Sequence, residues 1–235
     1  MNRSILSQRY DDERFPNIFY IGNNFQDIKI YRDWALGFNS PIKEPSDPGA
    51  YPDFLLEDAS NIWLILHNLL IDTGIGNEIY ENIKRFSKSV EFLGASIKYG
   101  KVQFYVNEKG LNSPVQIGRH SEGFVRFLCL LAILCHPEPP PVICIEEPEI
   151  CMHPDVIHLI ADLLKKASER TQLFVTTHSD ILISALSDTP ESVIVCDRLK
   201  SGTNLKRLEK DQLVKWLEKY TLGELWSMGE IGGVT

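Results

Sequence analysis

Two glutamates follow a short apolar segment in the sequence VICIEEP. Residues 142–145 are all apolar and predict a buried parallel strand, which places Glu146 and Glu147 at its carboxyl end. Ligands of open parallel sheets bind at that edge. Adjacent carboxylates repel one another unless a cation or a proton intervenes, and Mg²⁺ is commonly held by one or two carboxylates together with phosphates. Glu146 would then hold a metal ion, and Glu147 would polarise an attacking water. A solvated loop or an acid pair at a helix start is the alternative that these residues leave open.

A histidine follows a second apolar segment in the same way. Residues 173–176 predict another buried strand, which is followed by Thr177 and His178. If the two strands are neighbours, His178 lies on the same edge as the glutamates, where it could hydrogen-bond a phosphate or the attacking water. A histidine that only caps a turn at the end of a strand is the commoner case.

A third motif precedes both strands, in the sequence RHSEGFVRF. Ser121 is a candidate N-cap of the helix that follows, and Glu122 and Gly123 come directly after it. A helix start with a serine and a glycine can bind an anion, since free backbone N–H groups point outward there and glycine permits close approach. An ordinary capped helix is the alternative.

The pattern of apolar residues predicts the elements that position these motifs. In the second half, helices are expected over residues 124–135, 153–170, 181–186 and 211–220, and buried strands over 142–145, 173–176 and 193–196. Apolar strands separated by amphipathic helices predict a parallel sheet that is covered on both faces.

The first half of the chain predicts a different set of elements. Residues 1–30 predict short helical pieces broken at Pro16 and Gly22, residues 39–54 an exposed connection, residues 78–89 a helix, and residues 96–106 a hairpin. A helix is also expected after residue 60, with Ser60 or Asn61 as its N-cap, and Gly74-Ile75-Gly76 is interpreted as a turn between helices.

Composition limits the classes of protein. The chain has 235 residues and a formal charge of −8, which argues against a nucleic-acid binder whose whole surface is basic but permits a local basic patch. The longest apolar stretch, residues 127–135, is far too short to span a membrane, and the first residues do not form a secretory signal. The 5 cysteines form no C-x-x-C pair, which predicts buried thiols and a cytoplasmic protein.

The order of the three motifs resembles the C-terminal half of ABC-type ATPases of the RecF/SMC group. It is still more similar to the stand-alone predicted AAA-type ATPases of prokaryotes. The likeness covers most of the chain, with matching blocks at residues 31–34, 54–62, 136–149, 167–180, 189–198 and 216–233. The resemblance implies an α/β fold of the P-loop NTPase type, with a mainly parallel sheet flanked by helices.

The resemblance also implies roles for the candidate residues. Glu146 stands at the Walker B metal position, Glu147 at the catalytic base, and His178 at the switch histidine that senses the γ-phosphate. The segment Ser121-Glu122-Gly123 corresponds to the signature that caps ATP bound on the opposite subunit. The implied cofactors are ATP and Mg²⁺, and the implied assembly is a homodimer.

The sequence departs from the family pattern in two ways. His120, Phe124 and the loop 150–154 differ from the usual residues at those positions. No G-x-x-x-x-G-K-[ST] motif occurs in the 235 residues, so the Walker A loop that grips the β- and γ-phosphates is absent from this sequence. A fragment, a split or shortened gene product, and a degenerate relative all remain open.

We therefore predict the C-terminal part of an ATPase that binds and hydrolyses ATP in a dimer, if a Walker A segment or subunit is supplied. The expected division is an intermediate region over residues 1–115 and an ATPase half over residues 116–235. DNA transactions and phage defence are both open as the process served. The alternatives are a non-catalytic dimerisation module and, more weakly, a metal-dependent nuclease that uses Glu146, Glu147 and Glu149.

Overall fold

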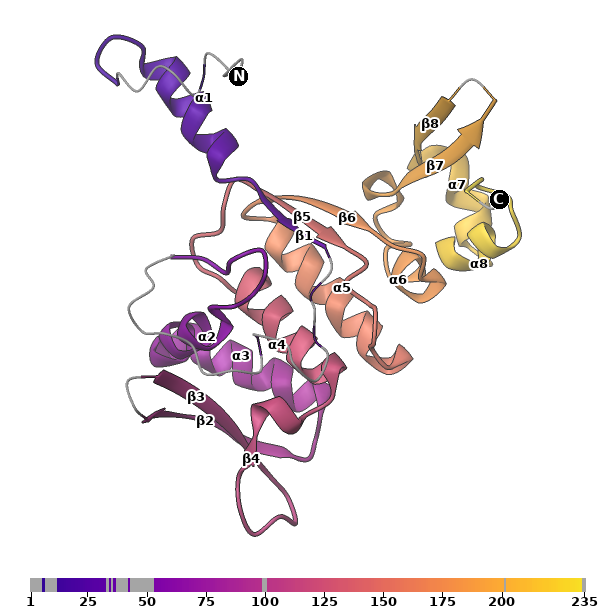
Figure 1. Ribbon diagram of the computed structural model, residues 1–235. Coiled ribbons are helices and arrows are strands. Elements are labelled where there is room, and N and C mark those ends of the chain that lie inside the picture. Colours follow the sequence, from indigo (N-terminus) through magenta and orange to yellow (C-terminus); the bar gives the residue numbers. More distant parts are fainter. Residues whose placement is uncertain are drawn as a thin grey trace.

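The structure is a computed structural model, shown in Figure 1. It describes residues 6, 12–32, 34, 36, 42, 53–98, 101–200 and 202–233. Most of the expected connection over residues 39–54 lies outside the described residues. Ile42 and Phe54, which belong to it and are described, are buried, so these two positions are not exposed as the proline-rich sequence predicted.

The central element is a parallel sheet of three strands. It consists of β1 (Lys29–Tyr31), β5 (Val142–Glu146) and β6 (Gln172–Thr176), in the order β1-β5-β6. Both pairings are parallel and in regular register. The predicted α/β fold with a parallel sheet is confirmed, and the two strands that carry the chemical motifs are direct neighbours.

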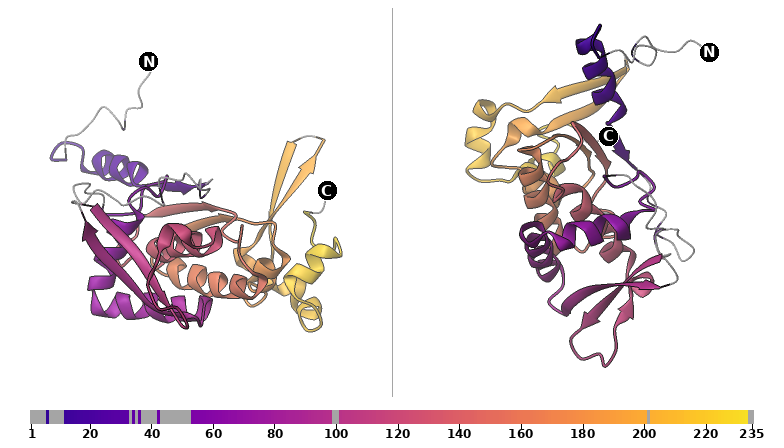
Figure 2. Two further views of the ribbon diagram at one scale, coloured as in Figure 1. Left: turned by 60° about the horizontal axis from the view of Figure 1, so that its bottom comes forward. Right: turned by 90° about the vertical axis from the view of Figure 1, so that its left-hand side faces the viewer.

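Helices cover one face of this sheet. The two main ones are α4 (Glu122–Leu134) and α5 (Pro154–Ser168), which lie on the same side of the strands in Figures 1 and 2. Ile143 and Ile145 are buried on that side. Helix α4 is almost wholly buried because its sequence is apolar all round, as expected of a helix in the middle of a core.

The opposite face of the sheet carries an apolar row that no described element covers. Ile30, Cys144 and Phe174 occupy matching positions in β1, β5 and β6. Ile30 is 39% exposed and Phe174 is 56% exposed. The prediction of cover on both faces is therefore wrong for the described residues. The apolar residues 173–176 predicted a strand whose side chains are all buried. In β6, however, successive side chains alternate between half-buried and exposed.

A second layer packs beyond α4. It contains α2 (Ile62–Ile71), α3 (Thr73–Phe86), a short 3₁₀ turn (Ile117–Arg119), and an antiparallel sheet of β2 (Val90–Lys98), β3 (Lys101–Glu108) and β4 (Val115–Gln116). The hairpin predicted there is confirmed, although its turn residues lie outside those described. Buried Trp63 and Phe104 join α2 to β3, with ring centroids 5.4 Å apart.

Two sequence interpretations in this region need correction. The carboxylate of Asp72 accepts hydrogen bonds from the N–H groups of Gly74 and Ile75, so α3 begins at once and both glycines lie inside it. The expected turn at Gly74-Ile75-Gly76 is therefore displaced to Asp72. Asn61 precedes α2 as expected, but its side chain bonds Leu56 and Phe54 and does not cap the helix.

Helix α1 (Pro16–Gln26) projects from the body of the molecule. Proline suits the first turn of a helix, where its missing N–H has no partner to lose, and Pro16 begins this one. The helix continues through Gly22, which is its one buried residue. The break predicted at Gly22 is therefore wrong.

The last part of the chain forms a small unit around its own apolar cluster. It contains α6 (Asp180–Ser184), a 3₁₀ turn (Pro190–Ser192), β7 (Ile194–Leu199), β8 (Gly202–Arg207), α7 (Lys210–Leu217) and α8 (Leu222–Ser227). Strand β7 pairs antiparallel with β8 and does not join the parallel sheet. The third buried strand predicted at residues 193–196 is thus wrong, because only Val195 of this strand is buried.

Helix α6 joins the small unit to the larger one, because Leu182 packs in the larger apolar cluster and Ile183 in the smaller one. Helix α8 is held against it. The hydroxyl groups of Ser184 and Thr221 are hydrogen-bonded at 3.0 Å. A Cβ atom at Gly223 would lie 2.1 Å from the carbonyl oxygen of Asp180, so α8 approaches α6 as closely as glycine allows. The larger apolar cluster includes side chains from both sides of residue 115, and the division predicted there stays a prediction.

Phe127→Ala should destabilise the chain far more than Phe174→Ala. Phe127 is fully buried and its ring centroid lies 4.6 Å from that of Phe86. Its truncation should lower the free energy of unfolding by about 3–5 kcal/mol. Truncation at Phe174, on the uncovered sheet face, should change it by about 0.5 kcal/mol or less. Urea unfolding measures both, and equal losses would show that the Phe174 face is covered.

Candidate functional site

The carboxyl end of β5 leads into a tight turn. Glu146 ends the strand opposite Thr176 and is exposed. The next residue, Glu147, has a φ of 42°, a left-handed conformation that side chains other than glycine rarely adopt. Its N–H donates to the carbonyl oxygen of Thr176 at 3.0 Å. The two glutamates therefore leave the strand in different directions, and Glu147 turns toward β6.

Glu147 and His178 face one another across the two strand ends. Glu147 Oε1 lies 3.7 Å from His178 Nε2. The histidine side chain is 81% exposed and that of the glutamate 31% exposed, so the pair lies at the surface with the carboxylate partly enclosed. The structure thus brings together Glu146, Glu147 and His178 at one edge. The catalytic roles assigned to them stay predictions.

Glu149 also lies at this edge, although the sequence analysis named it only in the nuclease alternative. Its Oε1 accepts one hydrogen bond from the Thr177 hydroxyl and another from the His178 N–H at 3.3 Å. Its Oε2 is buried and has no hydrogen-bond partner among the described residues. The partners are 28 and 29 positions away in the chain, so no local pattern in the sequence indicates this contact.

The three glutamates do not make a metal site of the nuclease kind. Glu149 Oε1 accepts hydrogen bonds from the Thr177 hydroxyl and the His178 N–H. Across the part of the chain that the structure describes, no group of three or more His, Cys, Asp or Glu side chains could hold a metal ion. The nuclease alternative stays a prediction.

The helix start at Ser121 is a capped one. Ser121 Oγ accepts a hydrogen bond from the Phe124 N–H at 3.3 Å, and both Ser121 and Glu122 are exposed. A Cβ atom at Gly123 would lie 2.3 Å from the carbonyl oxygen of Cys151. The close approach that Gly123 permits is thus made by the chain's own backbone, where the sequence analysis expected a ligand.

This contact joins the start of α4 to the loop that follows the glutamates. Cys151 also has a left-handed φ, at 64°, and its side chain is exposed, contrary to the expected burial of the thiols. Cys196 is exposed as well. The loop ends at His153, whose Nδ1 accepts a hydrogen bond from the Asp155 N–H at 3.3 Å and so caps α5.

His120, directly before this helix start, is half-buried against Phe124. The two ring centroids are 5.2 Å apart, and His120 Nε2 has no hydrogen-bond partner among the described residues. Burial lowers the pKa of His120. The charge of Glu108 and a hydrogen bond with the backbone of Val115 partly oppose that shift. The neutral ring is therefore the form that suits the folded state.

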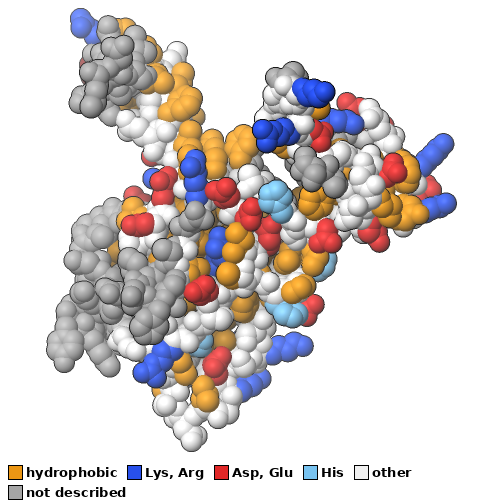
Figure 3. Space-filling view, turned by 45° about the vertical axis from the view of Figure 1, so that its right-hand side comes forward, with side chains coloured by type: hydrophobic (Ala, Val, Ile, Leu, Met, Phe, Trp, Pro, Cys, Tyr) orange, Lys and Arg blue, Asp and Glu red, His pale blue; other side chains and the backbone are white. Residues whose placement is uncertain are grey.

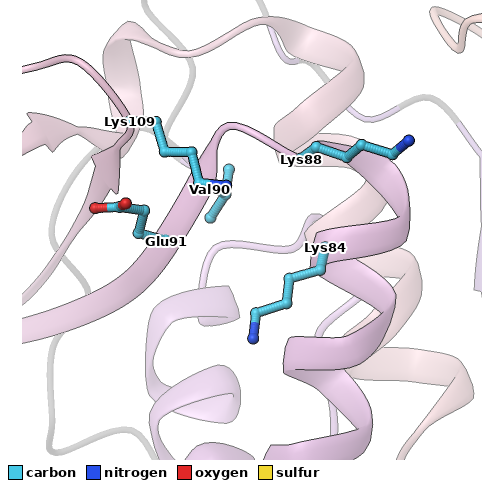
Figure 4. A pocket seen from close by; sticks show the side chains of 5 residues that line it. All are labelled: Lys84, Lys88, Val90, Glu91 and Lys109. Carbon is cyan, nitrogen blue, oxygen red and sulfur yellow. The ribbon is translucent and has the colours of Figure 1, made fainter.

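Acidic and histidine side chains gather on the face shown in Figure 3, between the main body and the C-terminal unit. A pocket of about 500 Å³ lies elsewhere, at the end of α3 (Figure 4). It is lined by Lys84, Lys88, Val90, Glu91 and Lys109. None of the residues at the glutamate edge belongs to this pocket. No helix among the described residues is long and apolar enough to cross a membrane.

The model of one protein family matches residues 2–184. Its description is "AAA domain, putative AbiEii toxin, Type IV TA system". The matched part includes the turn after β5, His178 and the start of α4. The chain belongs to this family of AAA domains, which confirms the resemblance to AAA-type ATPases. No curated protein matches.

Several solved structures of SMC heads are similar to the chain. A chain from a study of ATP-driven dimerisation and DNA-stimulated activation of SMC ATPases is 18% identical. The match covers 59% of this chain and 86% of that one, with a TM-score of 0.43. The Smc head from Pyrococcus furiosus bound to the C-terminal domain of ScpA is 16% identical, covering 69% and 44%, with a TM-score of 0.46. An Smc head bound to the C-winged helix domain of ScpA is 16% identical. That match covers 79% of this chain and 56% of the other, with a TM-score of 0.48.

Gly123→Ala should destabilise the chain, whereas Gly74→Ala should not. The added methyl group at Gly123 meets the Cys151 carbonyl, which is backbone and cannot turn aside. The expected loss is about 1–3 kcal/mol, as for other overpacked sites. At Gly74 the nearest atom is 3.4 Å away, so alanine should stabilise α3 by about 0.5–1 kcal/mol. Chemical unfolding of both variants tests this, and a neutral Gly123→Ala would refute the contact.

His120→Leu should reduce the loss of stability at acid pH. The unfolded chain takes up a proton on histidine near the ordinary pKa of about 6.5, whereas folded His120 does so only at lower pH. As the pH falls below about 6.5, the unfolded state binds protons before the folded state does, and the folded state loses stability.

The measurement compares urea midpoints at pH 5 and pH 7.5. The difference between them should shrink in His120→Leu and stay the same in His158→Gln, which alters an exposed histidine of α5. Part of the difference should remain, because burial also lowers the pKa of His136. An unchanged difference in His120→Leu would contradict the assignment.

Proposed function

We propose that this chain supplies the metal-binding and water-activating part of an ATP-hydrolysing site that works in a dimer. The observation that carries the proposal is the 3.7 Å approach of Glu147 Oε1 to His178 Nε2 beside exposed Glu146. The three side chains come from the carboxyl ends of neighbouring parallel strands, which is the edge where such sheets bind ligands.

The carboxylates fit Mg²⁺ only together with a phosphate ligand. Glu146 is exposed and offers one or two oxygens, while the described residues provide no cluster that could complete a site alone. Mg²⁺ demands six oxygens and is usually held by one or two carboxylates, waters and substrate phosphates. Glu146 would hold the ion, which when bound neutralises charge that develops on the phosphates.

The proposed division of labour follows from how Glu147 and His178 are held. The backbone of Glu147 is fixed by its bond to Thr176, and its partly enclosed carboxylate is free to accept a proton from an attacking water. His178 is exposed beside it and can donate to a phosphate oxygen or orient the same water.

The grip on the phosphates must come from another segment or subunit in this proposal, since the sequence contains no Walker A motif. The uncovered row of Ile30, Cys144 and Phe174 supports the presence of such a segment or subunit. Exposure of an apolar sheet face to water is unfavourable, and apolar patches of this kind commonly mark interaction sites. A strand and helix that carry a phosphate loop would bury this row and stand beside the glutamate edge.

The dimer and the remaining partners are also proposals. Ser121 and Glu122 are exposed at the start of α4, where they can face the nucleotide of a second subunit. A nucleic acid could contact Lys84, Lys88 and Lys109, which line the pocket at the end of α3. DNA transactions, phage defence and a cytoplasmic location stay predictions. The alternative of a non-catalytic dimerisation module would need none of the geometry at the glutamate edge.

Glu147→Gln should strongly reduce turnover but preserve ATP binding once the chain is combined with a segment that carries the phosphate loop. Glutamine keeps the shape of the side chain but cannot accept a proton at neutral pH. Loss of a general base costs about 10²–10⁴-fold in rate, and removal of a negative charge beside the γ-phosphate should hold or improve affinity. The ATP-bound dimer should accumulate.

Glu146→Gln is the matched comparison, because weakening the metal ligand should lower both binding and turnover. Turnover, ATP dissociation constant and ATP-dependent dimerisation are measured for both variants. If Glu147→Gln hydrolyses ATP at the parent rate, Glu147 is not the base and the non-catalytic alternative gains. The chain alone should bind Mg-ATP weakly in calorimetry, and micromolar binding would show that it has a phosphate grip of its own.

A further inference from the structure

We propose that Glu149 is a positioning residue that holds His178 against Glu147. The inference deepens the proposed function and rests on it for the catalytic importance of His178. The contact itself does not depend on that function. Glu149 joins the turn after β5 to the turn after β6, and these turns carry the two side chains that meet at the site.

One oxygen of Glu149 binds two consecutive residues of the facing turn. The Thr177 hydroxyl and the His178 N–H both donate to Oε1. The described residues offer the His178 N–H no other acceptor. The backbone on both sides of the Thr177–His178 peptide is thereby fixed relative to Glu149, and the direction in which the His178 ring leaves the chain is fixed with it.

The contact continues into α6. Because the Thr177 hydroxyl donates its one proton to Glu149, its oxygen is free to accept, and it receives the Ser179 N–H at 3.0 Å. Ser179 Oγ in turn accepts the Leu182 N–H at 3.2 Å and caps α6. Glu149 therefore orients a hydroxyl that holds the first residues of the helix after His178.

The burial of Glu149 argues against an incidental contact. A glutamate with no structural task turns both oxygens to water, but Oε2 of Glu149 is buried without a partner among the described residues. Burying such an oxygen costs free energy. The two bonds at Oε1 involve a charged acceptor and are the interactions that offset this cost.

Without Glu149 the two turns are joined at this point mainly through the Glu147 N–H and the carbonyl oxygen of Thr176. That bond fixes the end of β6 but not the residues after it. His178 is 81% exposed and has few packing contacts that could hold its ring. Loss of Glu149 should therefore release His178 while the strands stay paired.

The first test is amide hydrogen exchange in the chain alone, with no nucleotide. In Glu149→Ala the amides of His178 and Ser179 should exchange roughly tenfold to a hundredfold faster, the range expected for hydrogen bonds to a charged acceptor. Glu149→Gln retains an acceptor oxygen and should keep most of the protection. Thr177→Val should speed the exchange of the same two amides, whereas Thr177→Ser keeps the hydroxyl and should not. Glu169→Ala, which removes an exposed carboxylate at the end of α5, is the control.

The second test asks whether Glu149 holds the histidine ring. Glu147→Gln should shift the NMR signals of the His178 ring in the parent chain, because the two side chains lie 3.7 Å apart. In the Glu149→Ala background the same change should leave those signals in place. In the complete ATPase, Glu149→Ala should lower kcat with little effect on the ATP dissociation constant.

Unchanged exchange in both Glu149→Ala and Thr177→Val would overturn the proposal, as would equal losses in Glu149→Ala and Glu149→Gln. If Glu149→Ala does not fold, the His178 amide in Thr177→Val keeps the test valid, because its acceptor is Glu149 and valine does not remove it. A chain that passes both tests but whose complete assembly never hydrolyses ATP would refute the proposed function and leave the positioning of His178 intact.

Discussion

The geometry of the carboxyl edge depends on the strained turn that follows β5. Two of its residues, Glu147 and Cys151, hold left-handed backbone conformations that cost about 1–3 kcal/mol each for residues other than glycine. Such strain persists only where the surroundings fix it. Here buried Pro148, the bond of Glu147 to Thr176 and the contacts of Glu149 do so. The turn aims one carboxylate across the sheet edge and presses the Cys151 carbonyl against Gly123.

This turn also explains why three motifs that are far apart in the sequence come together in the structure. The strand register places Glu146 beside Thr176, and the turn then brings the next residues to His178 and to the start of α4. The turn thus contacts the start of α4 through the Cys151 carbonyl oxygen, and it contacts His178 through the side chains of Glu147 and Glu149.

The sequence was sufficient for the elements whose signal is local. The apolar runs of β5 and α4, and the proline at the start of α5, predict those elements closely. The neighbouring strands then place His178 near Glu147 by topology alone. What could not be predicted depends on tertiary contacts. Residues 193–196 resemble a buried strand, yet β7 pairs with β8, and no pattern distinguishes an apolar strand of a sheet from one in an exposed hairpin.

Glu149 and Gly123 illustrate the same limit within the site. The sequence shows a third glutamate and a glycine, but their partners are set by how the two turns and the helix meet. An acid two positions after a pair of glutamates is easily interpreted as another metal ligand. Its actual partners, a hydroxyl and a backbone N–H, become visible only when the turns are placed in space.

Strand β6 ends the parallel sheet among the described residues, and this has a consequence for handling the chain. The outer side of β6 presents backbone donors and acceptors in the extended conformation, next to the exposed ring of Phe174. Edges of this kind recruit strands from other molecules, because pairing satisfies the backbone and buries the apolar side chain together. The formal charge of −8 opposes such association through repulsion between copies. High salt screens that repulsion and should therefore turn a dispersed solution of this chain into one that aggregates edge to edge.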